Sequence, residues 1–232
     1  MPWQEKPLQK SYACNGGLVS FLRQKRGWTQ REFAKQSGYS ERLVSKAEAS
    51  QPISASTVAD LADTLSTGDD PVHPEDLVSD PVAMAKAYIA AEYEYPGSNV
   101  DRIRHFLDEN MVMRMNGDPQ VIPFAGEHHG IDGLQRAYAI FFSIIEVPPN
   151  HDWRPWYKFA SQGNEVIVWG QNWMGPIGHP LTKPMQLVHR FVFRRGKLVI
   201  KEVLFDAAEG AEYLRQAGML DEAGKILSAS GS

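Results

Sequence analysis

Residues 29–46, TQREFAKQSGYSERLVSK, determine the fold of the first part of this chain. Thr29 stands three positions before Glu32, which is the spacing of a capping box and predicts that a helix begins there. Gly38 suits the left-handed conformation that ends a helix, and Ser40 can cap a second helix directly after it. The stretch therefore predicts two helices joined by a tight turn.

Apolar residues recur at helical spacing on both sides of this turn. They form four short bursts at residues 18–22, 33–34, 43–47 and 58–65. A candidate N-cap precedes each burst: Asn15, Thr29, Ser40, and either Ser54 or Ser56. We therefore expect an all-α domain of four short helices over residues 15–66. The second helix of such a tightly joined pair can enter a DNA major groove.

The charge distribution also separates the front of the chain from the rest. Residues 1–66 contain nine Lys or Arg and six Asp or Glu, whereas residues 67–232 contain fifteen and twenty-two. Residues 17–48 hold seven basic and three acidic side chains, a local excess that attracts polyanions. This pattern favours a nucleic-acid partner for the front of the chain, and a solvated basic face is the alternative.

Residues 21–65 resemble the helix-turn-helix of the Cro and lambda-repressor type, which belongs to the XRE family. The resemblance is carried by Arg23, Arg26-Gly27, Thr29-Gln30, Phe33-Ala34, Gly38, Ser40, Val44-Ser45, Glu48, Leu61-Ala62 and Leu65.

This resemblance implies that the chain contacts a double-stranded DNA operator. Gln30 and Ser40 would bind phosphates from helix N-termini, and Arg42 would read a guanine. The alternatives are a simple capping role for Gln30 and a solvated Arg42. Arg23 would pair with Glu48 and join the first helix to the third. The full set of implied DNA contacts is Gln30, Arg31, Ser40, Glu41, Arg42, Ser45 and Lys46. Because one module makes few contacts, a homodimer is expected.

Residues 67–80 are rich in breakers and acids and predict a linker, with a second domain over residues 81–220. In the second domain, periodicity predicts two helices, the second ending near Asn110, and short strands over 111–115 and 121–125. A helix over 131–146 should follow, then four strands over 153–161, 165–174, 184–194 and 197–205 and a last helix over 207–217. This order predicts an α+β cone in which a curved antiparallel sheet folds around helices.

Residues 82–217 resemble the nuclear transport factor 2-like superfamily, in its SnoaL-like branch, on stretches 100–110, 122–134 and 191–208. The superfamily includes ketosteroid isomerases, epoxide hydrolases, polyketide cyclases and non-catalytic ligand-binding or dimerisation domains. The isomerases carry a carboxylate where this chain has the acid-free residues 122–126. Epoxide hydrolases and some cyclases carry an Asp where this chain has Val203, while Asp206 matches the terminal Asp. The resemblance therefore implies no catalytic residue.

Alternation along the strands predicts the lining of a pocket. Ile167, Trp169, Gln171 and Trp173 share one side of their strand, and Met185, Leu187, His189, Phe191 and Phe193 share one side of theirs. An apolar pocket with a few polar groups is typical of a small-molecule site. The predicted ligand contacts are Tyr88, Phe141, Trp169, Gln171, Trp173, His189 and Asp206. The alternatives are a packed aromatic core around a satisfied His189, and an N-cap role for Asp206.

Several classes of protein are disfavoured. The single Cys14 allows no internal disulfide. The adjacent His128 and His129 point to opposite sides of a strand, so no metal site is expected. No cofactor is expected either. The longest apolar run, residues 137–145, is too short to span a membrane, and residues 1–10 have no signal-peptide region. A cytoplasmic protein is expected.

These observations predict a DNA-binding transcriptional regulator whose second domain dimerises and senses a small apolar effector. One alternative is a SnoaL-type isomerase, hydrolase or cyclase with an accessory DNA-binding domain. Another is a dimerisation module whose cone is filled by its own side chains.

Overall fold

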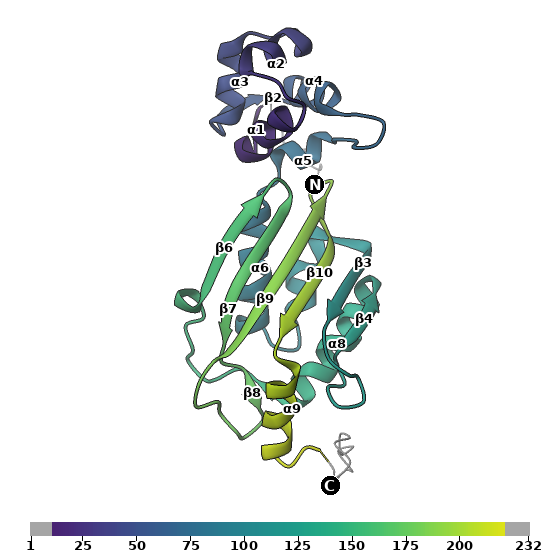
Figure 1. The fold of residues 1–232 in the computed structure, drawn as a ribbon, viewed down its shortest axis with the longest axis vertical. Coiled ribbons are helices and arrows are strands. Elements are labelled where there is room, and N and C mark those ends of the chain that lie inside the picture. Colours follow the sequence, from purple (N-terminus) through teal and green to yellow (C-terminus); the bar gives the residue numbers. More distant parts are fainter. Residues whose placement is uncertain (1–10, 221–232) are drawn as a thin grey trace, which may run out of the picture. The chain divides into compact units, whose positions relative to one another are not determined.

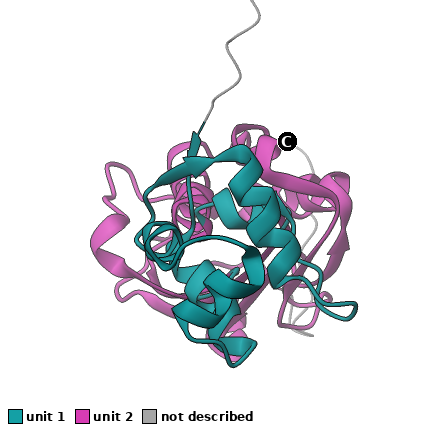
Figure 2. Ribbon diagram, turned by 90° about the horizontal axis from the view of Figure 1, so that it is seen from above, with its two compact units in different colours: residues 1–80, 162–164, 194–196 teal, residues 81–161, 165–193, 197–232 magenta. Residues whose placement is uncertain are grey.

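The computed structural model describes residues 11–220, so the prediction about a signal peptide in residues 1–10 lies outside the described residues. The chain divides into two compact units, which Figure 2 colours separately. Within the described residues, the N-terminal unit comprises residues 11–80, 162–164 and 194–196, and the C-terminal unit comprises the remainder. The first unit is helical and the second is α+β, which confirms the predicted fold class.

The N-terminal unit contains the four predicted helices (Figure 1): α1 (Gly16–Lys25), α2 (Gln30–Ser37), α3 (Glu41–Glu48) and α4 (Ala55–Leu65). The predicted capping box is complete, because Thr29 Oγ1 accepts from the Glu32 amide at 3.2 Å while the Glu32 carboxylate accepts from the Thr29 amide at 2.7 Å. The helix α2 ends on Gly38, whose φ of 74° is left-handed as predicted. Asn15, Ser40 and Ser54 cap the other three helices.

The core of this unit holds α1 and α3 in close contact. A Cβ atom at Gly16 would lie 2.1 Å from the carbonyl oxygen of Glu48, so only glycine allows this approach. The apolar stripes of the helices meet here, with Phe33, Val44 and Leu61 fully buried. Burial of this stripe stabilises helices that are too short to persist alone.

The segment over residues 67–80 differs from the prediction of a linker. It contains α5 (Pro74–Val78), whose Leu77 is fully buried in the core of the N-terminal unit together with Val72. The interpretation as a segment without elements is wrong, because isolated apolar residues between acids give no periodicity even when they are buried. The short antiparallel pair β1 (Ser11–Ala13) and β2 (Pro52–Ser54) was also not predicted.

The C-terminal unit begins with α6 (Pro81–Glu94), α7 (Asn99–Ile103) and the 3₁₀ turn η1 (Arg104–Phe106). The strand β3 (Leu107–Met115) then starts before Asn110, so the predicted helix end there is wrong. Residues 121–125 form turns, and the strand β4 (Gly126–His129) follows them before α8 (Gly130–Ile144). Ile122 and Phe124 are buried two positions apart, and this spacing explains why the segment was predicted as a strand.

Six strands form one curved sheet in the order β4-β3-β10-β9-β7-β6 (Figure 1). The remaining members are β6 (Tyr157–Gln162), β7 (Glu165–Asn172), β9 (Met185–Arg194) and β10 (Lys197–Phe205). The predicted meander is confirmed as the run β6, β7, β9, β10, but the sheet is mixed, because β10 lies parallel to β3. A small sheet of β5 (Ile145–Glu146) and β8 (Gly175–Pro176), the 3₁₀ turn η2 (Arg154–Trp156) and the helix α9 (Ala207–Gln216) complete the unit.

The two faces of this sheet have different environments. Its inner face packs on α6 and α8 and carries buried side chains such as Val166, Val168 and Phe191. Its outer face carries Trp169 and Leu204, which are 61% and 57% exposed. Within residues 11–220, no helix has both the length and the apolar character needed to cross a membrane.

Candidate functional site

The first candidate site is the solvent-facing side of α3. Glu41, Arg42, Ser45 and Lys46 are all exposed, whereas Val44 and Ala47 are fully buried in the domain core. Arg31, from α2, is also exposed, and Ser40 is exposed while its hydroxyl accepts from the Leu43 amide at 3.3 Å. The helix therefore presents a row of polar side chains that no other described element covers.

A buried ion pair fixes the orientation of this helix. Arg23 Nε donates to Glu48 Oε1 at 2.5 Å and its Nη2 donates to Oε2 at 3.1 Å, so the implied pairing of α1 with α3 is confirmed. Gln30 Nε2 also donates to Glu48 Oε2, at 2.8 Å. Burial acts to raise the pKa of Glu48, but the hydrogen bonds from Arg23 and Gln30 outweigh it and lower that pKa. The hydrogen bond to Glu48 thus holds the Gln30 side chain at the start of α2.

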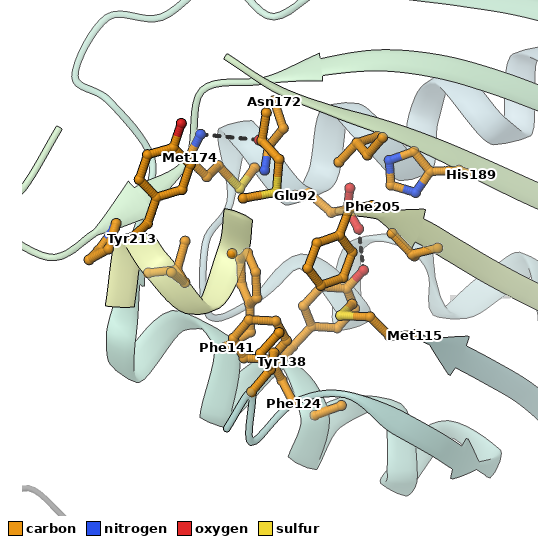
Figure 3. Close-up of a pocket in the computed structure, with 18 of the residues that line it drawn as sticks. Glu92, Met115, Phe124, Tyr138, Phe141, Asn172, Met174, His189, Phe205 and Tyr213 are labelled. Carbon is orange, nitrogen blue, oxygen red and sulfur yellow. Dashed lines mark hydrogen bonds between the residues drawn. The ribbon is translucent and has the colours of Figure 1, made fainter. Parts of the chain in front are cut away.

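The second candidate site is a pocket between the inner face of the sheet and helices α6, α8 and α9 (Figure 3). Its walls are mainly apolar and sulfur-containing: Met113, Met115, Ile122, Phe124, Phe141, Met174, Met185, Leu187, Val203, Phe205 and Leu214. Such a lining is typical of small-molecule sites. Figure 3 shows Phe124, Phe141 and Phe205 arranged around the same space.

A cluster of charged and polar side chains from three elements meets at this pocket. Lys201 Nζ, from β10, donates to Glu92 Oε1 of α6 at 2.5 Å and to Tyr138 Oη of α8 at 2.7 Å. The Tyr138 hydroxyl donates to the same Glu92 oxygen. The Lys201 side chain is 1% exposed and that of Glu92 is 10% exposed. Because the two charges are paired and hydrogen-bonded, the cluster adds no net charge to the pocket.

Burial sets the protonation behaviour of this cluster. It lowers the pKa of Lys201, and the adjacent Glu92 carboxylate opposes that shift. It raises the pKa of Tyr138 well above the usual value for a phenol, and Glu92 adds to that rise. The Tyr138 hydroxyl therefore stays protonated and acts as a hydrogen-bond donor at neutral pH.

His189 also lines the pocket, from the inner face of β9 opposite Val168. It is 3% exposed, and neither Nδ1 nor Nε2 has a hydrogen-bond partner among residues 11–220. Its ring is stacked with that of Phe191 at a centroid distance of 5.7 Å. Burial, and secondarily the charge of Lys201, lower the pKa of His189 well below its usual value, so the imidazole is neutral at pH 7.

A second group of polar side chains lies at the end of β7, around Asn172. The Tyr93 hydroxyl donates to Asn172 Oδ1 at 2.7 Å and lies 3.0 Å from the Tyr157 hydroxyl. The Met174 amide donates to the same Asn172 oxygen at 3.1 Å. This group fixes the amide of Asn172 where it lines the pocket.

Comparison with known protein families decides the nature of the N-terminal unit. A sequence model described as a helix-turn-helix domain matches residues 17–74. The N-terminal unit is a helix-turn-helix domain. The match extends past α4 to the first residue of α5, which agrees with the burial of Val72 in the same core. In helix-turn-helix domains the second helix of the pair reads the major groove, and that helix is α3 here.

Solved structures similar to this chain align with the part that follows the helix-turn-helix domain. One is an NTF2-like protein from Burkholderia xenovorans LB400, with 19% identity, a TM-score of 0.47, and coverage of 57% of this chain and 94% of that chain. Another is an NTF2-like protein from Burkholderia pseudomallei K96243, at 16%, 0.47, 58% and 97% respectively. A third, from Catenulispora acidiphila DSM 44928, has a ketosteroid isomerase-like fold and contains trimethylamine, at 12%, 0.43, 58% and 92%. No curated protein matches the chain.

The structure brings only part of the predicted ligand set into the pocket. Phe141 and His189 line it. Tyr88 is fully buried and its hydroxyl lies 3.1 Å from that of Tyr138, so it supports the polar cluster from outside the lining. Asp206 caps α9, accepting from the amides of Ala208 and Glu209 at 3.0 and 3.1 Å, as its alternative interpretation predicted.

The predicted placement of Trp169, Gln171 and Trp173 in the pocket is wrong. Trp169 pairs with Val188 and Gln171 with Gln186 on the outer face, whereas His189 pairs with Val168 on the inner face. The grouping of Trp169 with Gln171 on one side of β7 was correct, but that side is the outer one. The inner side of β7 carries Val166 and Val168. Trp173 lies beyond the end of β7 and packs on the Trp156 ring at 5.4 Å.

Three residues of the polar cluster were missed from the sequence: Glu92, Tyr138 and Lys201. A signal existed for two of them, because Lys201 interrupts an apolar period-two row with Val203, and Glu92 follows Tyr88 by one helical turn on a buried face. Such isolated charges in apolar rows indicate a buried pair, but the sequence does not show which charges meet.

The histidine pair on β4 has separate partners. His128 Nε2 lies 3.0 Å from the Phe124 carbonyl oxygen, and His129 Nε2 lies 2.9 Å from Glu127 Oε1. In the part of the chain that the structure describes, no three or more His, Cys, Asp or Glu side chains are grouped to hold a metal ion.

Proposed function

We propose that this protein is a sequence-specific DNA-binding transcriptional regulator whose C-terminal unit binds a small, mainly apolar molecule, self-associates and carries out no catalysis. The observation that carries the proposal is the exposed polar face of α3 within a helix-turn-helix domain. Arg42 and Lys46 provide positive charge there, and Glu41 and Ser45 provide hydrogen-bonding groups. This combination suits both phosphate contacts and base readout.

The rigidity of the domain supports this role. Arg23 and Glu48 hold α1 against α3, and the capping box at Thr29 fixes the start of α2. Because the helices are held by buried and capped contacts, the α3 side chains keep their spacing without DNA. Preorganisation of this kind reduces the entropy lost on binding.

Self-association through the outer face of the sheet is supported by its exposed apolar residues. Ile167, Trp169 and Leu204 are 39%, 61% and 57% exposed on this face. A row of ion pairs lies on the same face, with Arg190 2.7 Å from Glu165 and 2.8 Å from Glu202. Aromatic anchors beside a charged rim are characteristic of protein interfaces. Two copies would present two α3 helices to two half-sites.

A binding experiment tests the regulator proposal. The full chain would be used to select duplexes from a randomised pool, and the selected duplex would then be titrated against random competitor at about 150 mM salt. We expect a preference of about a thousandfold or more for the selected duplex. A chain that enriches no sequence would contradict the proposal. A matched control is the double variant Arg42→Ala, Lys46→Ala, which should lose the preference.

Glu92 favours a second candidate, a proton-transfer enzyme, because it supplies a carboxylate in the pocket. However, Glu92 Oε1 already accepts hydrogen bonds from Lys201 and Tyr138, and the positions that bear the acid in related enzymes are apolar. A paired carboxylate is a poor general base. The two candidates are separated by incubating the chain with an isomerisable ketone or an epoxide: turnover abolished by Glu92→Gln would establish the enzyme, and no turnover supports the regulator.

A further inference from the structure

His189 is the polar side chain of the pocket whose hydrogen-bonding groups are left unpaired by the described residues. The other polar side chains that line the pocket each have a hydrogen-bond partner: Glu92, Tyr138, Tyr157, Asn172, Lys201 and Tyr213. Both nitrogens of the buried His189 ring lack one within the described chain. An unpaired buried donor and acceptor are unfavourable, so the position needs another partner.

The charges around the pocket indicate which kind of partner fits. Lys201 and Glu92 neutralise each other, and the lining contains no other charged side chain among the described residues. An ionic ligand would therefore enter an apolar site without a free counter-charge, which is strongly unfavourable. Such a lining favours uncharged molecules over ions.

The walls indicate the rest of the ligand. Aromatic rings at Phe124, Phe141 and Phe205 face the space, and the four methionines Met113, Met115, Met174 and Met185 line it. Unbranched methionine side chains adapt to the outline of a bound group and contact rings favourably. A flat apolar molecule suits such walls.

We propose that His189 anchors an uncharged, mainly apolar ligand that carries a hydroxyl or carbonyl oxygen. This inference rests on the proposed ligand-binding role of the C-terminal unit. A neutral imidazole offers one N–H donor and one acceptor. A hydroxyl can bond to either nitrogen, and a carbonyl can accept from the protonated one. The remainder of the ligand contacts the apolar walls.

Three probes of similar size test the proposal on the full chain by isothermal titration calorimetry: naphthalene, 2-naphthol and 2-naphthoate. We expect 2-naphthol to bind roughly 2- to 10-fold more tightly than naphthalene, the range expected for one net hydrogen bond. The anionic 2-naphthoate should bind more weakly than either. In His189→Phe the ratio of 2-naphthol to naphthalene affinity should fall to about one, whereas His189→Gln, which still donates and accepts, should retain a preference.

Other results would overturn the proposal. An unchanged preference for 2-naphthol in His189→Phe shows that another group is the anchor. Absence of binding by all three probes shows that the pocket is packed core. Without ligand, His189→Phe should unfold at an unchanged or higher temperature, because it removes an unpaired buried group. A large drop would instead identify His189 as a structural residue.

The DNA selection on the same samples keeps this inference separate from the regulator proposal. Loss of probe binding with retained DNA preference would overturn the ligand inference alone. Probe binding without any DNA preference would overturn the regulator proposal and leave the anchor role of His189 in place.

Discussion

Arg23 and Glu48 join α1 to α3 through a contact of 2.5 Å, with side chains only 11% and 9% exposed. Arg23 also donates to the carbonyl oxygen of Trp28 at 2.7 Å, so one guanidinium connects both ends of the turn that precedes α2. The orientation of α3 therefore depends on Arg23, a residue of another helix that lies outside the exposed polar face of α3.

Replacement of Glu48 by Ala should destabilise the helix-turn-helix domain. The change leaves the Arg23 guanidinium buried without its counter-charge, for which a loss of roughly 3 kcal/mol in the free energy of unfolding is expected. Urea unfolding of the full chain measures it. The matched control is Glu212→Ala in the exposed Arg215–Glu212 pair, which should change stability by less than about 1 kcal/mol. Equal effects of the two substitutions would show that the Arg23–Glu48 pair is not a structural contact.

Replacement of Arg42 by Ala should weaken binding to the selected duplex by roughly 1–3 kcal/mol, because its planar guanidinium can pair with a guanine edge. The effect should be smaller on random duplex, since a base contact carries sequence information and a phosphate contact does not. Titration of both duplexes at one salt concentration measures this difference. Arg215→Ala, on α9, is the exposed-arginine control. A uniform loss on both duplexes would assign Arg42 to the phosphates.

Replacement of Lys201 by Met should destabilise the C-terminal unit by roughly 3–5 kcal/mol, because Glu92 then remains as an unpaired buried charge. The double variant Lys201→Met, Glu92→Gln should recover part of this loss, since no charge is left in the cluster. Lys183→Met, in the exposed pair with Glu209, is the control and should have little effect. If the double variant is less stable than Lys201→Met alone, the two residues do not act as a pair.

His189 should make the stability of the protein fall in mild acid. Its pKa is lowered in the folded state, first by burial, so the unfolded chain binds a proton below about pH 6.5 that the folded protein does not. Stability should then rise with pH up to that value, by at most about 1.4 kcal/mol per pH unit from this group.

Urea unfolding between about pH 5 and pH 7.5 checks this expectation in the natural protein and in His189→Phe. The two curves should diverge below about pH 6.5 and run parallel above it. The pKa of His151 is also lowered by burial, but this residue is present in both proteins and cancels in the difference. Curves that stay parallel throughout would show that folding does not lower the pKa of His189.

Replacement of Trp169 by Ser should weaken self-association by roughly tenfold or more, if this 61% exposed indole anchors the proposed interface. Sedimentation velocity at several protein concentrations measures the dissociation constant. The control is Ile177→Ser, which removes an apolar side chain of 44% exposure from outside the six-stranded sheet. A monomeric natural protein, or a dimer unaffected by Trp169→Ser, would refute the assignment of this face.

The amino-acid sequence by itself determined the helix-turn-helix domain. The features that define it are local: the cap at Thr29, the left-handed Gly38 and the next cap at Ser40. Each involves only a few neighbouring residues, so their spacing can be recognised without knowledge of distant contacts. The strands of the meander and the last helix were also predicted, because alternation and helical periodicity are local properties.

Only the tertiary structure decided the composition of the pocket. Glu92, Tyr138 and Lys201 are far apart in the sequence, and their contact depends on how α6, α8 and β10 pack together. The inner face of β7 was likewise decided by packing: a strand with apolar residues on both sides, such as Val168 and Trp169, does not itself specify which side meets the helices. Local patterns therefore determined the helices and strands, and the long-range packing of these elements determined which polar side chains meet in the pocket.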